Sequence, residues 1–325
     1  MTLLELRGLT TAFQTGRGEI SAIEDVSFDL NEGEILGIVG ESGSGKSVTA
    51  LTIMGLLPQP PARIAAGSVR FAGEELTTAS PGRMEKIRGA GISMVFQEPM
   101  TSLNPVFTIG EQIMETVRAH DRMSARAQRD RAIEMLDRVG IPSATERLND
   151  YPHQLSGGQR QRVMIAMSLA CRPKLLIADE PTTALDVTIQ AQVLDLLMDL
   201  RDELGMAIIV ITHNMGVIAE VADRVLVMYA GRIVEQSPAA NLFAAPQHPY
   251  TKGLLACVPT LEQDRHRLIA IPGALPEPTR RPPGCCFAPR CTYCIEACHA
   301  AVPPLIVQRD DRAVACIRAD ELVAS

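Results

Sequence analysis

Three short apolar runs along the chain are typical of strands buried on both faces of a parallel sheet. They span residues 34–39, 174–179 and 206–212, and hydrophobic side chains fill most of their positions. Helix-like apolar stretches lie at 48–57 and at 163–171. Strands and helices that alternate in this way predict an α/β fold over residues 1–258.

The pattern changes after residue 258. Nine of the 22 prolines lie between Pro259 and Pro304, in a stretch with little helical or strand periodicity. Six of the eight cysteines follow one another between Cys285 and Cys316. We therefore predict a second, smaller, Pro- and Cys-rich module over residues 259–325, joined to the larger domain by a Pro-rich link.

Composition limits what such a chain does. Of its 325 residues 46% are hydrophobic, enough for a sizeable core, while no apolar run approaches the roughly 18–20 residues of a membrane-spanning helix. The first residues carry charge at once, unlike a signal peptide, so we expect a chain that is neither secreted nor membrane-spanning. The net charge of −7, from 31 Lys and Arg against 38 Asp and Glu, disfavours dedicated binding to nucleic acid.

A phosphate-binding loop follows the first apolar run. Its residues are Gly40, Glu41, Ser42, Gly43, Ser44, Gly45, Lys46 and Ser47, and Val48 opens the next helix-like stretch. Glycines let backbone N–H groups surround phosphate oxygens at a helix N-terminus, Lys46 can reach the β- and γ-phosphates, and Ser47 can hold Mg²⁺. The sequence therefore predicts binding of a nucleoside triphosphate.

Acidic residues and a histidine end the other two predicted strands. Asp179 and Glu180 follow the second run, where ligands bind in open α/β sheets. Asp179 suits the Mg²⁺-side carboxylate, and Glu180 suits a general base or a group that orients the attacking water. His213 closes the third run and can reach a γ-phosphate.

A second candidate anion site lies at Leu155, Ser156, Gly157, Gly158 and Gln159, ahead of the helix-like stretch at 163–171. A hydroxyl, two bare glycines and a helix N-terminus form another cradle for phosphate. One site has no need of two γ-phosphate cradles, so we expect this one to serve the nucleotide of another subunit.

With these motifs in this order, residues 1–258 resemble the ATP-binding subunits of ABC transporters. The resemblance implies a P-loop NTPase (RecA-like) core with an antiparallel β subdomain and a helical subdomain over about 98–170. Gly40 to Ser47 then correspond to Walker A, Asp179 and Glu180 to Walker B, and Leu155 to Gln159 to the family signature. Phe13 matches the residue that stacks on adenine, and Gln97 the Q-loop residue near Mg²⁺ and the attacking water. Ala184, Leu185 and Asp186 match the D-loop, and His213 matches the switch histidine, which the family follows with Asp where this chain has Asn214.

A narrower resemblance extends to the tail. Residues 97–105, 151–159, 248–251 and 284–291 are similar to the dipeptide, oligopeptide and nickel branch of ABC importers. That branch implies an ATPase at the cytoplasmic face of the cell membrane, with a second ATPase, two transmembrane permease subunits and an extracytoplasmic substrate-binding protein as partners. It implies docking of a permease subunit at Glu98 to Pro105, and it does not identify the solute.

The branch pattern aligns Cys285, Cys291, Cys298 and Cys316 as ligands of a probable 4Fe–4S cluster. Four thiolates also suit a tetrahedral zinc ion, the spacing does not decide between the two, and unligated thiols are a third alternative. Cys286 and Cys294 lie outside the pattern, and Cys291 with Cys294 would make a plausible chelating pair.

The sequence thus predicts an ATPase that powers import of dipeptides or oligopeptides by ATP-driven dimerisation. One alternative is a soluble ABC-type ATPase that acts on nucleic acid or ribosomes; the single cassette and acidic balance argue against it. A second alternative is an iron–sulfur redox protein with an incidental nucleotide site, which the full set of hydrolytic residues disfavours.

Overall fold

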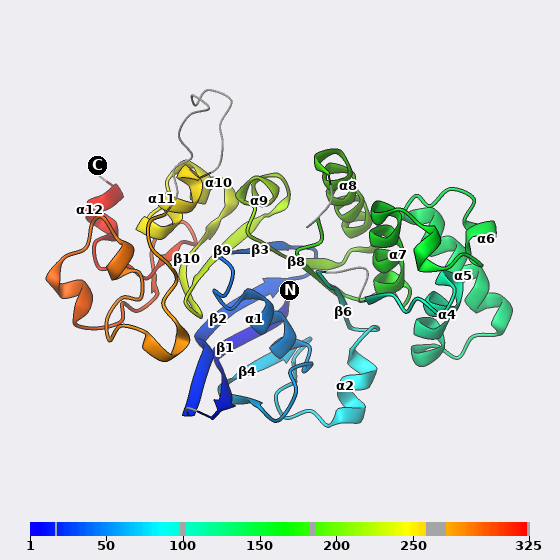
Figure 1. The fold of residues 1–325 in the computed structure, drawn as a ribbon, viewed down its shortest axis with the longest axis horizontal. Helices are drawn as coiled ribbons and strands as arrows, with labels where there is room; N and C mark the ends of the chain where they lie inside the picture. The colour runs from blue at the N-terminus through cyan, green and yellow to red at the C-terminus, as the bar shows by residue number, and fades with distance from the viewer. Residues whose placement is uncertain (17, 98–101, 183–185, 258–270, 324–325) are drawn as a thin grey trace. The chain divides into compact units, whose positions relative to one another are not determined.

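The computed structural model describes residues 1–16, 18–97, 102–182, 186–257 and 271–323 (Figure 1). The chain packs as two compact units, each made of separate segments. The first, here called the signature unit, contains Met1, Asn31–Glu34 and Thr78–Val210. The second, here called the phosphate-loop unit, contains Thr2–Leu30, Ile35–Thr77 and Ile211–Ser325.

The signature unit combines short parallel strands with a group of helices. Its strands pair in the order β6, β7 and β8, with β6 parallel to β7. Its helices α4, α5 and α7 pack on one another (Figure 1). The elements are β6 (Ile92–Val95), β7 (Leu175–Asp179), β8 (Ala207–Thr212, whose last two residues belong to the other unit), α2 (Pro81–Ile87), α4 (Ile109–His120), α5 (Ala125–Arg138), α6 (Ala144–Arg147), the 3-10 turn η1 (Pro152–Gln154), α7 (Gly157–Leu169) and α8 (Val187–Leu204).

The phosphate-loop unit contains an antiparallel sheet in the order β2-β1-β4-β5 and a second sheet in which β3 is parallel to β9. Antiparallel strands β10, β12 and β11 extend this second sheet beyond β9. The elements are β1 (Thr2–Thr15), β2 (Gly18–Asn31), β3 (Ile35–Val39), β4 (Ala62–Phe71), β5 (Glu74–Glu75), β9 (Arg224–Tyr229), β10 (Arg232–Pro238), β11 (Ile306–Val307), β12 (Ala313–Val314), α1 (Lys46–Ile53), α9 (Met215–Val221), α10 (Ala239–Ala244), α11 (Pro249–Ala256), α12 (Ala319–Val323) and the 3-10 turns η2 (Pro278–Arg280), η3 (Ala288–Arg290) and η4 (Glu296–His299).

The predicted α/β fold and its three buried strands are confirmed. Every residue of β3, β7 and β8 is buried, because these strands carry apolar side chains on both faces. The helix expected at 48–57 ends at Ile53, since Gly55 takes a positive φ of 59° there. The helix expected at 163–171 begins earlier, at Gly157, because Ser156 caps it.

The tail belongs to the phosphate-loop unit. Residues from Ile211 onward belong to the same compact unit as β3 and α1. The boundary predicted near residue 258 falls in 258–270, outside the described residues, so the division at that point stays a prediction. None of the helices in the described part of the chain combines the length and the apolar character needed to cross a bilayer.

Candidate functional site: a nucleotide-binding loop and its partners

The phosphate loop runs from β3 into α1 and surrounds a buried lysine. Lys46 Nζ donates hydrogen bonds to the carbonyl oxygens of Gly40, at 2.7 Å, and Glu41, at 3.0 Å. The residue is only 5% exposed, so its charge lies inside the loop rather than in solvent. A charge held there by loop carbonyls is placed to meet phosphate oxygens.

Two glycines give this loop its shape. A Cβ atom at Gly40, where φ is 154°, would lie 2.3 Å from the carbonyl oxygen of Met228. Gly45 precedes α1 with a φ of 105°, in the region that favours glycine. Ser44 is fully buried, and its Oγ has no hydrogen-bond partner among the described residues. Ser42 and Gly43 are exposed, while Ser47 and Val48 are half-buried in the first turn of α1. The loop therefore offers a buried hydroxyl and a buried cation next to an open edge.

In the signature unit, parallel pairing brings Gln97 and Glu180 together. β6 and β7 run side by side, and these residues follow their carboxyl ends. Gln97 Nε2 donates a hydrogen bond to Glu180 Oε2 at 3.1 Å. Asp179, the last residue of β7, is 5% exposed. The chain thus places two carboxylates and an amide at one edge of the sheet.

The backbone at Glu180 departs from the usual L-residue conformation. Its φ is +50°, a left-handed value that costs a non-glycine residue about 1–3 kcal/mol and clusters at functional sites. This turn follows the end of β7 directly and sets the direction of the Glu180 side chain.

His213 is exposed directly after β8, and Asn214 begins α9. Asn214 Oδ1 accepts hydrogen bonds from the N–H groups of Gly216, at 2.9 Å, and Val217, at 3.4 Å. An Asp would cap the helix through the same oxygen, which explains why Asn is accommodated at this position.

The predicted signature forms the start of α7. Ser156 Oγ accepts from the Gln159 N–H at 3.3 Å, and Gln159 Oε1 accepts from the Ser156 N–H at 3.0 Å, which together make a capping box. Leu155 is buried, whereas Ser156 and Gly157 are exposed. A Cβ at Gly158 would meet Ile189 Cγ2 at 2.9 Å, but a Cβ at Gly157 would meet none of the described residues within 4 Å. Packing among the described residues therefore favours glycine at 158 and places no such demand on 157.

The remaining predicted positions are less constrained. Phe13 is half-buried on β1, opposite Ala62 of β4. Asp186 caps α8 by accepting a hydrogen bond from the Ile189 N–H at 2.9 Å. Ala184 and Leu185 of the expected D-loop, and Glu98 of the expected docking segment, lie outside the described residues.

The tail cysteines separate into two groups. Cys285, Cys291, Cys298 and Cys316 all line one small cavity, together with apolar residues such as Phe287 and Leu322. Among the residues that the structure describes, no three His, Cys, Asp or Glu side chains meet closely enough to share one metal ion. The four thiols therefore share a cavity without converging on a single point.

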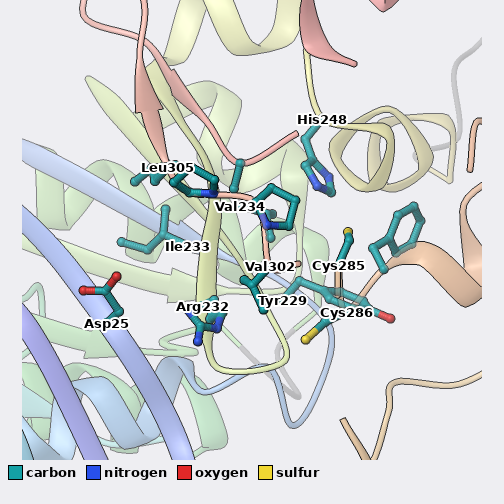
Figure 2. Close-up of a pocket in the computed structure, with 14 residues that line it drawn as sticks. Asp25, Tyr229, Arg232, Ile233, Val234, His248, Cys285, Cys286, Val302 and Leu305 are labelled. Carbon is teal, nitrogen blue, oxygen red and sulfur yellow. The ribbon is translucent and has the colours of Figure 1, made fainter. Parts of the chain in front are cut away.

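The other two tail thiols lie elsewhere. Cys286 lines a neighbouring cavity of about 230 Å³ with Arg232 and Asp25, and Figure 2 shows its thiol pointing away from that of Cys285. Cys294 is half-buried, with its sulfur 3.4 Å from His299 Nε2 and next to the Cys298 thiol. Of the alternative chelating pair, Cys291 lines the shared cavity and Cys294 is not part of its lining.

Burial raises the pKa of three of the cavity thiols. It raises the pKa of Cys285 to about 11 and raises the pKa of Cys291 and Cys316 above the usual thiol value. Metal ions bind thiolates, so a metal that entered this cavity would displace protons from these groups.

The contacts that Arg290 of the tail and Tyr250 of α11 make with the phosphate loop could not be predicted from the sequence. Arg290 pairs with Glu41, the second residue of the loop, with Nη1 to Oε2 at 2.6 Å. The Glu41 N–H donates a hydrogen bond to the Tyr250 hydroxyl at 2.8 Å. These partners are more than 200 positions from Glu41 in the chain, and no local spacing links them.

Together, the glycine loop around Lys46 and the acids that end β7 define a P-loop nucleotide-binding protein. A family model described as ABC transporter matches residues 23–183, and a model described as the oligopeptide/dipeptide transporter C-terminal region matches residues 234–298. The chain belongs to the ATP-binding proteins of the ABC transporter family and is an ABC-type ATPase.

Similar proteins share nearly the whole chain. A Brucella abortus (strain 2308) protein named as a peptide import ATP-binding protein is 56% identical over 301 residues, which cover 93% of this chain and 90% of that protein. A Brucella melitensis (biotype 1) protein with the same kind of name is 53% identical over 333 residues, covering 99% and 98%.

Solved structures of ATP-binding cassettes share the fold. A dimer of the cassette MJ0796 in a post-hydrolysis state, bound to ADP and Pi, is 31% identical, with a TM-score of 0.66 over 73% of this chain and 99% of that one. The structure of cbiO1 from Clostridium perfringens, part of an ABC transporter complex, is 28% identical, with a TM-score of 0.65 over 75% and 91%.

Proposed function

We propose that this chain is the ATP-hydrolysing subunit of an importer for dipeptides or oligopeptides. The observation that carries the proposal is the extent of the match: proteins named for peptide import align with 99% of the chain, including the tail. The match to the oligopeptide/dipeptide transporter C-terminal region supports the same assignment. No feature of the described residues favours the alternative action on nucleic acid or ribosomes.

The phosphate loop would bind ATP and begin the reaction. Lys46 would move from the loop carbonyls to the β- and γ-phosphates, and Phe13 would stack on adenine. The hydroxyl of Ser47 and the carboxylate of Asp179 are hard oxygen donors that suit Mg²⁺, with Gln97 near it. The metal would neutralise charge on the β- and γ-phosphate oxygens.

Glu180 would activate water for in-line attack on the γ-phosphate. The hydrogen bond from Gln97 Nε2 to its carboxylate supports a fixed orientation for this base. His213, exposed at the end of β8, would stabilise the charge that develops on the phosphate.

The signature would act on the nucleotide of a second ATPase subunit. Ser156 and Gly157 are exposed, and a Cβ built at Gly157 would meet none of the described residues within 4 Å. An open glycine at a helix N-terminus leaves room for a phosphate to approach. ATP would thus lie between the Walker A loop of one subunit and the signature of the other, with Asp186 and the rest of the D-loop near the same interface.

The remaining partners would be two transmembrane permease subunits and a substrate-binding protein outside the membrane. Val106 is 70% exposed and Phe107 is 48% exposed, directly after the expected docking segment Glu98 to Pro105. Exposed apolar side chains at this point suit contact with a permease subunit. The chain would then lie at the cytoplasmic face of the cell membrane without crossing it.

Purification of the tagged full chain from detergent-solubilised membranes of its own cell tests the assembly. We expect two multi-span proteins and a second ATPase to co-purify. In proteoliposomes, the complex should hydrolyse ATP faster when binding protein and a dipeptide or oligopeptide are both added. Recovery with ribosomes or nucleic acid, in place of membrane subunits, would overturn the proposal.

We further propose that Cys285, Cys291, Cys298 and Cys316 hold a 4Fe–4S cluster. All four line one cavity, and neither Cys286 nor Cys294 is part of its lining. A 4Fe–4S cluster takes four cysteine ligands, and these four thiols line the same cavity. Such a centre would link segments of the tail.

Anaerobically purified protein tests this centre through its iron, sulfide and zinc content and its visible absorption. About four iron and four sulfide per chain are expected. Serine variants at the four cavity cysteines should lose them, whereas Cys286→Ser and Cys294→Ser serve as matched controls that should keep them. Stoichiometric zinc, or no metal, would overturn the cluster and leave the ATPase intact.

A further inference from the structure

The phosphate loop is held chiefly at Glu41, by the side chains of Arg290 and Tyr250. Arg290 Nη1 and Nη2 contact Glu41 Oε2 and Oε1 at 2.6 and 2.9 Å, so the guanidinium and carboxylate form a two-point pair. Such planar pairs fix orientation as well as attracting charge. The side chain of Arg290 is only 5% exposed and that of Glu41 is 29% exposed, so the guanidinium lies on the buried side of the pair.

Arg290 is itself held in place from several directions. Its Nε donates to the Pro272 carbonyl at 2.9 Å, Nη2 donates to the Ile271 carbonyl at 3.3 Å, and Nη1 donates to the Tyr229 hydroxyl at 3.3 Å. The pair with Glu41 raises the pKa of Arg290 further. An arginine fixed in this way has little freedom to follow a mobile loop, and instead holds the loop still.

Tyr250 holds the backbone of the same residue. Its hydroxyl accepts the Glu41 N–H at 2.8 Å, and the side chain is fully buried. Its ring packs against Tyr229 and Phe287, with ring centroids 4.6 and 5.4 Å away. Both the side chain and the backbone of Glu41 are therefore anchored by residues that follow the last core strands.

This anchorage reaches the lysine that meets phosphate. Glu41 presents its carboxylate to Arg290, its N–H to Tyr250 and its carbonyl oxygen to Lys46 Nζ. A second tail residue, Leu275, lies 3.5 Å from where a Cβ of Gly43 would be. The tail thus lies beside the loop at Gly43, and through Glu41 its Arg290 is linked to the ammonium group of Lys46.

We propose that Arg290 and Tyr250 are positioning residues for ATP binding: they hold the phosphate loop in its binding shape before nucleotide arrives. A loop that must be ordered on binding loses affinity by the free energy of ordering it. Loss of the contacts that Arg290 and Tyr250 make with Glu41 therefore weakens ATP binding even in fully folded protein. Through Arg290, the tail contributes to nucleotide affinity without touching the nucleotide.

The test is a double-mutant cycle on the full chain, with Arg290→Met, Glu41→Gln and the pair combined. ATP affinity is measured at 10 °C, with circular dichroism showing that each variant is folded. Each single variant should bind ATP roughly 10-fold more weakly, and the double variant no more weakly than the worse single, since contacting residues are not additive. Arg280→Met, which breaks an exposed tail pair with Glu277, is the matched control and should bind as wild type.

Two further readouts separate positioning from stability. Hydrogen exchange over residues 40–47 of nucleotide-free Arg290→Met should be faster than in wild type, whereas exchange in β1, which Arg290 does not contact through any of these hydrogen bonds, should be unchanged. Tyr250→Phe keeps the packed ring and removes only the hydroxyl, so it remains informative if Arg290→Met does not fold, and it should weaken ATP binding about threefold to fivefold. If folded Arg290→Met binds ATP within twofold of wild type, the proposal is overturned. If Arg290→Met does not fold, the same result for Tyr250→Phe overturns it.

Discussion

Two helices of this chain begin at glycine-rich segments, and the protein holds them in opposite ways. At the start of α1, Lys46 is buried and the loop is gripped through Glu41 by distant residues. At the start of α7, Ser156 and Gly157 are exposed, and the cap is closed locally with Gln159. The first is braced by its own chain, and the second is open.

This difference indicates how work is divided between the two starts. Burial and long-range contacts preorganise the first for a ligand that must be bound firmly. The second closes a capping box that satisfies the N–H groups of Ser156 and Gln159, and its exposed Gly157 is available to a surface outside the chain. A nucleotide held by the first start and covered by the second start of another subunit accounts for both arrangements.

The largest expected effect concerns hydrolysis of the nucleotide that the loop before α1 would bind. Glu180→Gln removes the proposed base while its amide can still accept from Gln97, so hydrolysis should slow by about 10²–10⁴-fold. ATP affinity should stay within about threefold of wild type. Phosphate release and equilibrium ATP binding, measured on the same preparation, check both parts.

Lys46→Ala is the contrasting variant. It removes a buried charge that would bond phosphate oxygens, and charge-assisted hydrogen bonds contribute about 1.5–3 kcal/mol each. ATP binding itself should therefore weaken by at least about 10-fold. Near-normal turnover in Glu180→Gln would exclude Glu180 as the catalytic base. Normal ATP binding in Lys46→Ala would show that the start of α1 does not bind the nucleotide through its buried lysine.

The buried strands and the phosphate loop could be predicted from sequence, because both depend on neighbouring residues. Residues 34–39, 174–179 and 206–212 became β3, β7 and β8 nearly to the residue. Gly40 to Ser47 has a fixed spacing that by itself implies the loop. Parallel strands that end in acids likewise place Glu180 at a sheet edge, although its contact with Gln97 comes only from pairing of β6 with β7.

The grip on Glu41 could not be predicted, because its residues are brought together only by the folded tail. Arg290 is separated from Glu41 by 249 positions, and no periodicity joins them. The same applies to the cavity that separates four tail cysteines from Cys286 and Cys294. Spacing alone left those alternatives open, since 3-10 turns and Pro-rich segments have no regular face.

The next largest effect concerns the stability of the start of α7 and distinguishes its two glycines, Gly157 and Gly158. A methyl at position 158 would press on Ile189, and overpacking costs about 1–3 kcal/mol, whereas a methyl at 157 meets open space and gains helix propensity of up to about 1 kcal/mol. Gly158→Ala should therefore lower the free energy of unfolding, and Gly157→Ala should not. Chemical denaturation of the two variants side by side measures this.

Activity should follow the other order if the open glycine faces a second nucleotide. Gly157→Ala should lower ATP hydrolysis in the assembled complex about 10-fold, while ATP binding by the isolated chain remains unchanged. Wild-type hydrolysis by Gly157→Ala would show that the second start needs no glycine for a partner, and the contrast between the two helix starts would then rest on packing alone.

The smallest expected effect is on the pH dependence of folding stability, and it tests the hydrogen bond between Tyr250 and Glu41 in the loop before α1. Burial raises the pKa of Tyr250, opposed by the hydrogen bond from the Glu41 N–H. The folded state thus keeps this proton at a pH where the unfolded chain, with a tyrosine pKa of about 10, has lost it. The stabilisation is complete below pH ~10 and is lost above it, at about 1.4 kcal/mol per pH unit.

Tyr250→Phe removes this dependence. At pH 8 wild type should be more stable by about 1 kcal/mol, because the Glu41 N–H keeps its acceptor, and between pH 10 and 11 that advantage should disappear. Urea unfolding at the three pH values measures the change, and Tyr151→Phe, an exposed tyrosine ahead of the second start, should keep the wild-type slope. Parallel curves for wild type and Tyr250→Phe would mean that the hydroxyl is not held at Glu41, and the first helix start would then be no more firmly braced on that side than the second.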